Sequence, residues 1–260
     1  MPTLFQIKSY LKHWLHVVDE HSIHSPFFFD FYEKVIQDKK SRQGFEEIEN
    51  VRTRLLQSTI EIEVQDLGAR SPHFTSEKRL LSKVAATSIS PPPLCELLYR
   101  IVRYQGAKSI VELGTSAGIT SLYLAKDTHA QVVTFEGNPD LVNIARTHFE
   151  LFESRNIRLI PGNLDSTLPD FLQNPAKINF ALMDANHRYE PTMRYFTLLS
   201  KRMSEKGIIV LDDIYHSEEM ARAWQELSRH DLVYGSVDLF RCGILFFDTA
   251  LHRQHYTWSM

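Results

Sequence analysis

The sequence predicts an α/β fold built on a doubly wound, mostly parallel sheet, and two observations support this prediction. From residue 94 onward, strand and helix patterns alternate along the chain. The strand patterns are short apolar runs that suit buried strands, and longer segments of helical periodicity separate them. Alternation of this kind is typical of βαβ units, in which a helix connects two parallel strands.

Five strand–helix units can be placed in this part of the chain. We expect strands over 108–113, 131–136, 157–161, 178–183 and 207–212. We expect helices over 94–105, 118–126, 139–153, 164–173, 190–203 and 216–229. Two final apolar runs, 231–237 and 240–247, have no helix between them, so we expect them to pair antiparallel.

The segment before this alternation has a different pattern and is expected to be mainly helical. Apolar residues recur at helical spacing from Leu4 to Val18, and Ser25-Pro26 is typical of a helix start. Further helices are expected around Phe45 to Leu55 and over 75–87, with a short strand over 59–65. The "SPPP" stretch then breaks the chain. We therefore predict an N-terminal extension over 1–90 and a second domain over 91–260.

The composition of the 260 residues argues against several classes of protein. A formal net charge of −3 does not suit a general nucleic-acid binder or a protein of anionic membranes. No stretch approaches the roughly 20 apolar residues of a spanning helix, and the N-terminus lacks the apolar core of a signal peptide. The two cysteines, Cys95 and Cys242, are expected to be buried thiols. We expect a soluble, cytoplasmic protein with no nucleic-acid and no membrane partner.

The first predicted strand ends in a glycine-containing turn, "ELGTSAG". Gly114 has no Cβ, which lets the backbone turn tightly and approach a ligand. The amides of Thr115 to Gly118 are expected to face that ligand at a helix N-terminus. The fingerprint G-x-G-x-x-G is absent, which argues against a nicotinamide oxidoreductase. A tight turn without a ligand is the plain alternative.

The next two strand ends carry groups that suit a nucleoside. Glu136 ends the second strand and could accept hydrogen bonds from both ribose hydroxyls. After the third strand, Asn163 or Asp165 could bind an adenine amino group. Either residue could instead cap the following helix, and both roles could hold together.

Taken together, Glu-x-Gly-x-x-x-Gly, the acid after strand two and the Gly-Asn-x-Asp turn resemble class I S-adenosylmethionine-dependent methyltransferases. The resemblance covers roughly residues 88–247. It implies a Rossmann-like seven-stranded sheet with its last strand antiparallel, and S-adenosylmethionine lying across the strand ends. By matching position, the residues around the methionine part would be Glu112, Gly114, Thr115, Ser116 and Gly118. Glu136 would hold the ribose and Asn163 the adenine, with Asp165 as the alternative to Asn163.

Reactive side chains gather after the fourth and fifth predicted strands. They are Asp184, Asn186, His187, Tyr189, Asp212 and Asp213. Because these strands would be neighbours, the carboxylates of Asp184, Asp212 and Asp213 would converge. Clustered carboxylates repel one another unless protons or a cation neutralise them. Hard oxygen ligands of this kind suit Mg²⁺.

This group is similar to that of two metal-dependent branches of the superfamily, the catechol-type and the macrolide-sugar O-methyltransferases. The second matches better, because His187 stands where the catechol type has Lys and Asp213 where it has Asn. The resemblance implies that Asp184, Asp212 and Asp213 bind the metal and that His187 is the general base. A bound cation would lower the pKa of the acceptor hydroxyl, and the imidazole would take its proton. As plain alternatives, Asp212 could cap a helix and His187 could bond a backbone carbonyl.

The leading expectation is therefore metal-assisted O-methylation of a small hydroxylated molecule. One alternative keeps the cofactor without the metal, and another is a methyltransferase-like domain that has lost catalysis. In related methyltransferases the segment before the sheet covers the active site, selects the substrate or builds a dimer, so a homodimer is one expectation here. Tyr189 and Tyr215 are expected to line a pocket, and His216 to support the site from behind.

Overall fold

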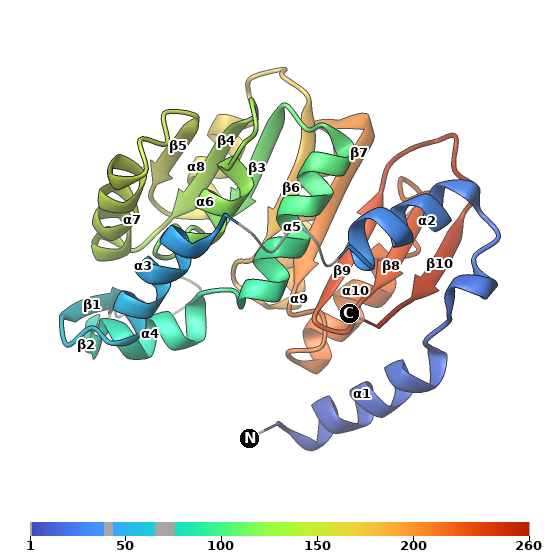
Figure 1. Cartoon of the computed structure of the whole chain (residues 1–260), viewed down its shortest axis with the longest axis horizontal. Coiled ribbons are helices and arrows are strands. Elements are labelled where there is room, and N and C mark those ends of the chain that lie inside the picture. The colour runs from blue at the N-terminus through green and yellow to red at the C-terminus, as the bar shows by residue number, and fades with distance from the viewer. Residues whose placement is uncertain (1, 39–43, 66–75, 260) are drawn as a thin grey trace. The chain divides into compact units, whose positions relative to one another are not determined.

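The computed structural model describes residues 2–38, 44–65 and 76–259 (Figure 1). Its strands are mostly parallel and flanked by helices, as in the Rossmann-like fold that the sequence predicts. The chain divides into two compact units. Unit 1 comprises Met1–Gln37 with Asn174–Met260, and unit 2 comprises Asp38–Gln173. The predicted boundary at residue 90 falls inside unit 2 and stays a prediction.

Unit 2 contains three parallel strands, β3 (Ser109–Leu113), β4 (Gln131–Glu136) and β5 (Ile157–Pro161), in the order β3-β4-β5. Leu113 lies opposite Phe135, and Glu136 lies opposite Pro161. The register therefore brings the three carboxyl ends to one edge. The turns that follow these strands, which carry the predicted cofactor residues, lie at that edge.

Helices of unit 2 pack on these strands and on one another. They are α3 (Glu46–Leu56), α4 (Leu81–Ser88), α5 (Pro92–Gln105), α6 (Ile119–Ala125), α7 (Pro139–Leu151) and α8 (Leu164–Phe171). α6 and α8 contact β4, and α7 contacts β5 (Figure 1). Every residue of α6 is buried, which fixes the start of this helix directly after the glycine turn.

A small hairpin in unit 2 corrects one predicted helix. The helix expected over 75–87 begins only at Leu81, and residues Ser76–Leu80 instead form β2, paired antiparallel with β1 (Glu61–Gln65). In this hairpin Glu63 lies opposite Lys78, and opposite charges at facing positions favour the pairing. Pairing with β1 thus outweighs the helical preference of "SEKRL". This pairing could not be predicted, because no local sequence pattern reveals it.

Among its described residues, unit 1 contains five strands, β6 (Ile178–Met183), β7 (Met203–Asp212), β8 (Gly235–Asp238), β9 (Cys242–Phe246) and β10 (Gln254–Thr257). Their order is β10-β8-β9-β7-β6. β9 runs antiparallel to β7 and to β8, which confirms the predicted antiparallel terminal pair. β10 pairs parallel with β8 and was not predicted, because four residues give little periodic signal.

The helices of unit 1 are α1 (Leu4–His16), α2 (Pro26–Phe31), α9 (Tyr189–Ser200) and α10 (Glu218–Leu227), and a π-helical turn over Tyr32–Ile36 continues α2. The aromatic residues of α2 form core. Phe28 and Phe31 are fully buried, and both rings contact Phe246 and Trp258. Within the described ranges, no helix is long and apolar enough to cross a membrane.

Candidate functional site

The glycine turn after β3 adopts the tight conformation that the sequence predicts. Gly114 has a φ of 100°, in the region that favours glycine. The amides of Gly114 and Thr115 both donate to the carbonyl of Phe135, at 3.1 and 3.0 Å. The turn is thereby fastened to the neighbouring strand β4.

The amides of this turn are engaged within the protein, which corrects part of the prediction. The Thr115 amide donates to Phe135, the Ser116 amide donates to the Glu136 carboxylate at 2.8 Å, and the Gly118 amide donates to the Thr115 carbonyl at 2.9 Å. These three amides are therefore not presented to a ligand as the helix start predicts. Gly118 has a packing role instead, because a Cβ there would lie 2.7 Å from the Phe149 ring of α7.

Glu112 lies inside the protein and not at the ligand edge. Its side chain is 0% exposed and accepts hydrogen bonds from the hydroxyls of Ser121 and Thr134. The Thr134 hydroxyl also bonds that of Thr115 at 2.6 Å. Glu112 thus ties β3, β4 and α6 together. In this conformation it does not reach a ligand, unlike the contact with the methionine part that the resemblance implies.

Glu136 joins two turns at the carboxyl edge of unit 2. One oxygen accepts from the Ser116 amide and the other from the Asn138 amide, both at 2.8 Å. Burial raises the pKa of Glu136, although these backbone hydrogen bonds act in the opposite direction. The carboxylate is half-buried and held in one orientation beside the glycine turn. This is the place where a ribose-binding acid is predicted.

Asn163 lies in the turn after β5 and caps the helix that follows. Its side-chain oxygen accepts from the Asp165 amide at 2.8 Å and so caps α8. Asn163 and Asp165 are both exposed at the edge next to Glu136. Of the two predicted alternatives, capping is confirmed for Asn163, and a contact with adenine stays a prediction for both residues.

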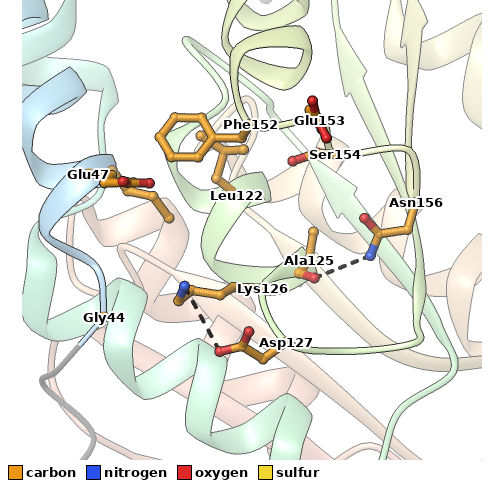
Figure 2. A pocket seen from close by; sticks show the side chains of 11 residues that line it. Gly44, Glu47, Leu122, Ala125, Lys126, Asp127, Phe152, Glu153, Ser154 and Asn156 are labelled. Atoms are coloured by element: carbon orange, nitrogen blue, oxygen red, sulfur yellow. Dashed lines mark hydrogen bonds and ion pairs between the residues drawn. The ribbon is translucent and has the colours of Figure 1, made fainter.

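Unit 2 also contains a cavity of about 240 Å³ (Figure 2). Its lining includes Glu47 of α3, Lys126 and Asp127 after α6, and Phe152 and Asn156 before β5. None of the predicted site residues is among the described residues that line it. This cavity therefore lies apart from the strand-end motifs.

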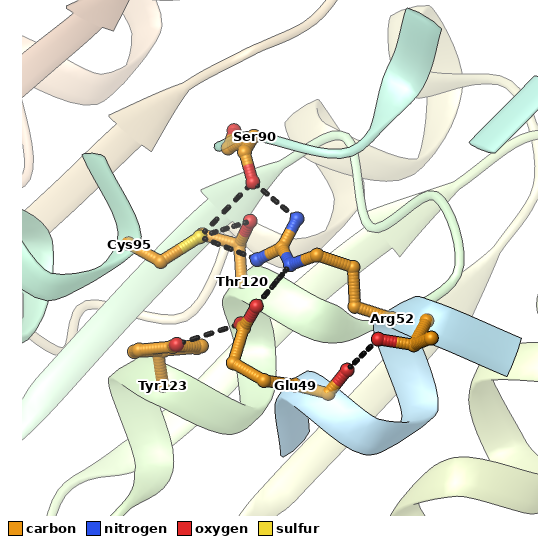
Figure 3. Close-up of polar contacts among 7 residues, drawn as sticks. Glu49, Arg52, Ser90, Cys95, Thr120 and Tyr123 are labelled. Atoms are coloured by element: carbon orange, nitrogen blue, oxygen red, sulfur yellow. Dashed lines mark hydrogen bonds and ion pairs between the residues drawn. The ribbon is translucent and has the colours of Figure 1, made fainter. Parts of the chain in front are cut away.

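A buried polar network joins α3, α5 and α6 in unit 2 (Figure 3). Arg52 donates to the Ser90 carbonyl at 2.6 Å and to the Glu49 carboxylate at 2.8 Å, and the Tyr123 hydroxyl donates to Glu49 at 2.8 Å. Another nitrogen of Arg52 lies 3.5 Å from the sulfur of Cys95. Burial raises the pKa of Cys95 to about 11, so it stays a neutral thiol near neutral pH. Both cysteines of the chain are free and buried, as predicted.

In unit 1 an arginine that the sequence analysis missed binds the predicted carboxylates. Arg241 donates to both oxygens of Asp212, at 2.9 and 2.8 Å, and a third nitrogen lies 3.2 Å from Asp213. Asp212 ends β7 with a side chain only 1% exposed, and it lies opposite Cys242 in β9. This antiparallel register carries Arg241 alongside the two aspartates. An arginine directly before the last strand, in "FRCGILFF", is the signal that could have revealed the contact.

The arrangement gives no support to the prediction that Asp184, Asp212 and Asp213 form a ligand set for a divalent cation. Both Asp212 oxygens bond the guanidinium, and one also accepts from the Asp213 amide at 2.8 Å. Two unit charges roughly 4 Å apart repel by about 4 kcal/mol at an effective dielectric constant of about 20, so Arg241 would weaken the binding of a metal ion beside it. Among residues 2–38, 44–65 and 76–259, no group of three or more His, Cys, Asp or Glu is arranged to hold a metal.

The charges of this group shift the pKa of its buried member. Burial and the nearby charge of Asp184 raise the pKa of Asp212 to about 7, against the lowering effect of Arg241. Arg241 itself stays protonated, because its carboxylate partners outweigh the cost of burial and raise its pKa. The acidic group therefore contains its own permanent cation.

His187 faces Asp184 across a strained turn that follows β6. The His187 Nε2 lies 3.4 Å from an oxygen of Asp184. The His187 amide donates to the Ala185 carbonyl at 2.9 Å, enclosing Asn186 at a φ of 64°. This is a γ-turn, which is rare because it strains a residue with a Cβ. The side-chain amide of Asn186 donates to the Tyr195 hydroxyl at 2.6 Å and so holds the turn on α9.

The electrostatic surroundings favour the charged form of His187. Burial alone would lower the pKa of this imidazole, but the hydrogen bond and charge of Asp184 and the charges of Asp213 and Asp212 outweigh it and raise the pKa. The Nδ1 atom is buried and has no hydrogen-bond partner within the part of the chain that the structure describes. The imidazole is therefore held through Nε2. The alternative expectation was a hydrogen bond from His187 to a backbone carbonyl, and no described carbonyl accepts one.

The two predicted pocket tyrosines have different places. Tyr189 is directed to α10, where its hydroxyl donates to Glu226 at 2.6 Å and Arg222 stacks on its ring at 3.6 Å. Tyr215 instead lines a cavity and donates to the Asp238 carboxylate at 2.7 Å. The ring of His216 lies 5.8 Å from that of His187, close enough for a supporting role.

That cavity has a volume of about 430 Å³ and lies within unit 1, between α1 and the strand-end group. Aromatic rings form part of its wall, with Phe240 5.1 Å from Tyr10 and 5.2 Å from Tyr215. Asp213 and Arg241 also line it. A space of this size, with apolar walls and a few polar groups, suits a small molecule.

Comparison with known proteins agrees with this fold. Residues 111–214 match the family model described as a methyltransferase domain. The chain is similar to an O-methyltransferase from Bacillus cereus in complex with SAH, at 17% identity and a TM-score of 0.57 over 84% of this chain and 94% of that chain. It is similar to the O-methyltransferase TomG from Streptomyces achromogenes in complex with SAM, at 20% identity and a TM-score of 0.52 over 62% and 81%.

A third structure, the SAH-bound methyltransferase PaMTH1 of Podospora anserina, gives 16% identity and a TM-score of 0.55 over 78% of this chain and 95% of that one. No curated protein sequence matches the chain. The chain thus contains a methyltransferase domain with the class I fold. These findings support an S-adenosylmethionine-dependent methyltransferase enzyme, in agreement with the resemblance seen in its motifs.

Proposed function

We propose that this methyltransferase transfers a methyl group to a hydroxyl of a small molecule, with His187 as the general base. The observation that carries the proposal is the His187–Asp184 pair, held in a strained turn at the carboxyl end of β6. Strain of this kind persists where the surroundings enforce it and is common at catalytic positions. The structural neighbours described as O-methyltransferases support oxygen as the atom that is methylated.

The cofactor would lie at the carboxyl edge of β3, β4 and β5. The Gly114 amide donates there to Phe135 of β4 and the Ser116 amide to Glu136, and Asn163 and Asp165 are exposed beside them. The tight turn and the oriented carboxylate fit a nucleoside, so we assign the ribose hydroxyls to Glu136 and the adenine to Asn163 or Asp165. Thr115 and Gly118 shape the turn, and Glu112 supports it from within. When bound, S-adenosylmethionine supplies the methyl group on its sulfonium.

The acceptor would occupy the 430 Å³ cavity of unit 1, which His216 lines and where the His216 ring lies 5.8 Å from that of His187. A neutral hydroxyl is a weak nucleophile, so removing its proton as the oxygen–carbon bond forms lowers the barrier. His187 would take that proton on Nδ1, the nitrogen that Asp184 does not hold, and Asp184 would orient the imidazole and stabilise its protonated form. A bound cofactor would supply the methyl carbon and leave as S-adenosylhomocysteine, and the product would be the methyl ether.

Magnesium, which the sequence led us to expect, is not part of this proposal, because Arg241 already binds both oxygens of Asp212 and one oxygen of Asp213. We propose a cytoplasmic location, which both free, buried thiols support. A homodimer and a lack of nucleic-acid or membrane partners stay predictions.

Calorimetric titration with S-adenosylhomocysteine, followed by a methyl-transfer assay on a panel of phenols and sugars, tests the proposal. We expect the wild-type protein to bind the ligand, and Glu136→Ala to abolish binding. Glu150→Ala, an exposed acid on α7, is the matched control and should bind normally. His187→Asn should bind the ligand and lose about 10²–10⁴-fold in turnover. Wild-type protein that neither binds the ligand nor methylates any acceptor would refute the proposal.

A further inference from the structure

We infer that Arg241 is the resident cation of the acidic group after β6 and β7, in the place where the resembling methyltransferases hold a divalent metal. The inference that this group then acts in methyl transfer rests on the proposed function. Exclusion of a metal by Arg241 does not depend on the proposed function, because it concerns only how the carboxylates are neutralised.

The contacts of Arg241 are those of a built ion pair and not of a surface encounter. Its planar guanidinium bonds both oxygens of Asp212, a two-point geometry that a lysine could not reproduce. The third nitrogen reaches Asp213 at 3.2 Å. The side chain of Asp212 is almost fully buried, so the carboxylate depends on this partner for its neutralisation.

The loop before β9 is shaped to place this arginine. The Arg241 amide donates to the Leu239 carbonyl at 2.7 Å, enclosing Phe240 at a φ of 64° in a second γ-turn. The Phe240 amide donates to Asp238 at 2.9 Å, and its ring stacks on Tyr215. Asp238 is itself buried and accepts from the Trp224 indole at 3.0 Å. These contacts hold the strained turn, and the turn holds the guanidinium at the carboxylates.

Arg241 also faces the cavity proposed for the acceptor. Its side chain is 40% exposed and lines that cavity together with Asp213. A guanidinium has five N–H donors, and the three contacts described use one on each nitrogen. The remaining donors can bond an oxygen of the acceptor, so Arg241 is a positioning residue that orients the acceptor where a metal would otherwise do so.

Titration with Mn²⁺ alone, followed by electron paramagnetic resonance, tests the inference without any turnover. We expect the wild-type protein to show no Mn²⁺ site that depends on Asp212 or Asp213. Arg241→Ala should bind Mn²⁺ at least 10-fold more tightly than wild type, because it frees the carboxylates, and adding Asp212→Asn should abolish that gain. Arg253→Ala, which removes the exposed pair with Asp231, is the matched control and should behave as wild type.

Two further measurements keep the inference decidable if Arg241→Ala does not fold. Arg241→Lys keeps the charge and should still exclude Mn²⁺, and EDTA should change wild-type turnover by less than 2-fold. A wild-type Mn²⁺ site that is lost in Asp213→Asn, or turnover that EDTA abolishes and Mn²⁺ restores, would overturn the inference. Absence of turnover with every acceptor would count against the proposed function alone, because the Mn²⁺ titration still decides the role of Arg241.

Discussion

At the scale of single residues, two strained turns of unit 1 lead into the proposed base and into the arginine that pairs with Asp212. His187 follows Asn186 and Arg241 follows Phe240, and both preceding residues have a positive φ without being glycine. Each such conformation costs of the order of 1–3 kcal/mol and persists only where its contacts enforce it. Here the contacts are the Asn186–Tyr195 hydrogen bond and the Phe240–Asp238 hydrogen bond.

The pH dependence of methyl transfer tests the role of His187. The charge of Asp184 helps to raise the pKa of His187, and only the neutral imidazole can accept a proton. The kcat/KM should therefore rise with pH through an apparent pKa above 6.5. Asp184→Asn removes a charge and an acceptor, so this limb should move to lower pH while the maximal rate falls. A limb that stays at the same pH in Asp184→Asn would contradict the assignment.

At the scale of elements, the glycine turn after β3 has a packing role. Gly118 begins α6 with a φ of 82°, and a side chain there would meet the Phe149 ring of α7. The engaged amides of this turn fasten it to β4. The motif therefore fixes the carboxyl edge on which Glu136 and Asn163 lie. The conformation of this edge depends on helix packing.

Comparison of two glycine substitutions tests this packing role. Gly118→Ala should lower the free energy of unfolding by about 2–4 kcal/mol, because it adds overpacking to a strained φ. Gly106→Ala is the control, since its φ is 62° but nothing lies within 4 Å of the added methyl. It should cost only about 1–2 kcal/mol. Equal losses for the two variants in urea unfolding would show that contact with Phe149 does not matter.

At the scale of the whole molecule, the N-terminal segment is part of the core of unit 1. Residues 1–37 share this unit with 174–260, and the α2 rings pack on strands from the end of the chain. Val18 also donates its amide to the Thr257 carbonyl of β10 at 2.9 Å. Unit 1 is therefore discontinuous in sequence, and its stability depends on both ends of the chain.

Two neighbouring phenylalanines test this dependence. Phe28 is fully buried against Phe246 and Tyr256, whereas Phe29 is 44% exposed. Phe28→Ala should lower the free energy of unfolding by about 3–5 kcal/mol. Phe29→Ala should change it by less than about 1 kcal/mol. Thermal unfolding monitored by near-ultraviolet circular dichroism measures both, and similar melting temperatures for the two variants would contradict the packing described here.

The sequence by itself determined the α/β class, the places of β4, β5 and β6 to the residue, and the methyltransferase resemblance. It could do so because strand periodicity and strand-end motifs are local in the chain. Tertiary structure alone decided that Glu112 is buried under Ser121 and Thr134, and that β2 is a strand. It alone placed Arg241 on Asp212, because the antiparallel pairing of β7 with β9 joins residues 29 positions apart. The sequence predicts that clustered carboxylates need a neutralising cation, but only the folded chain shows which cation neutralises them.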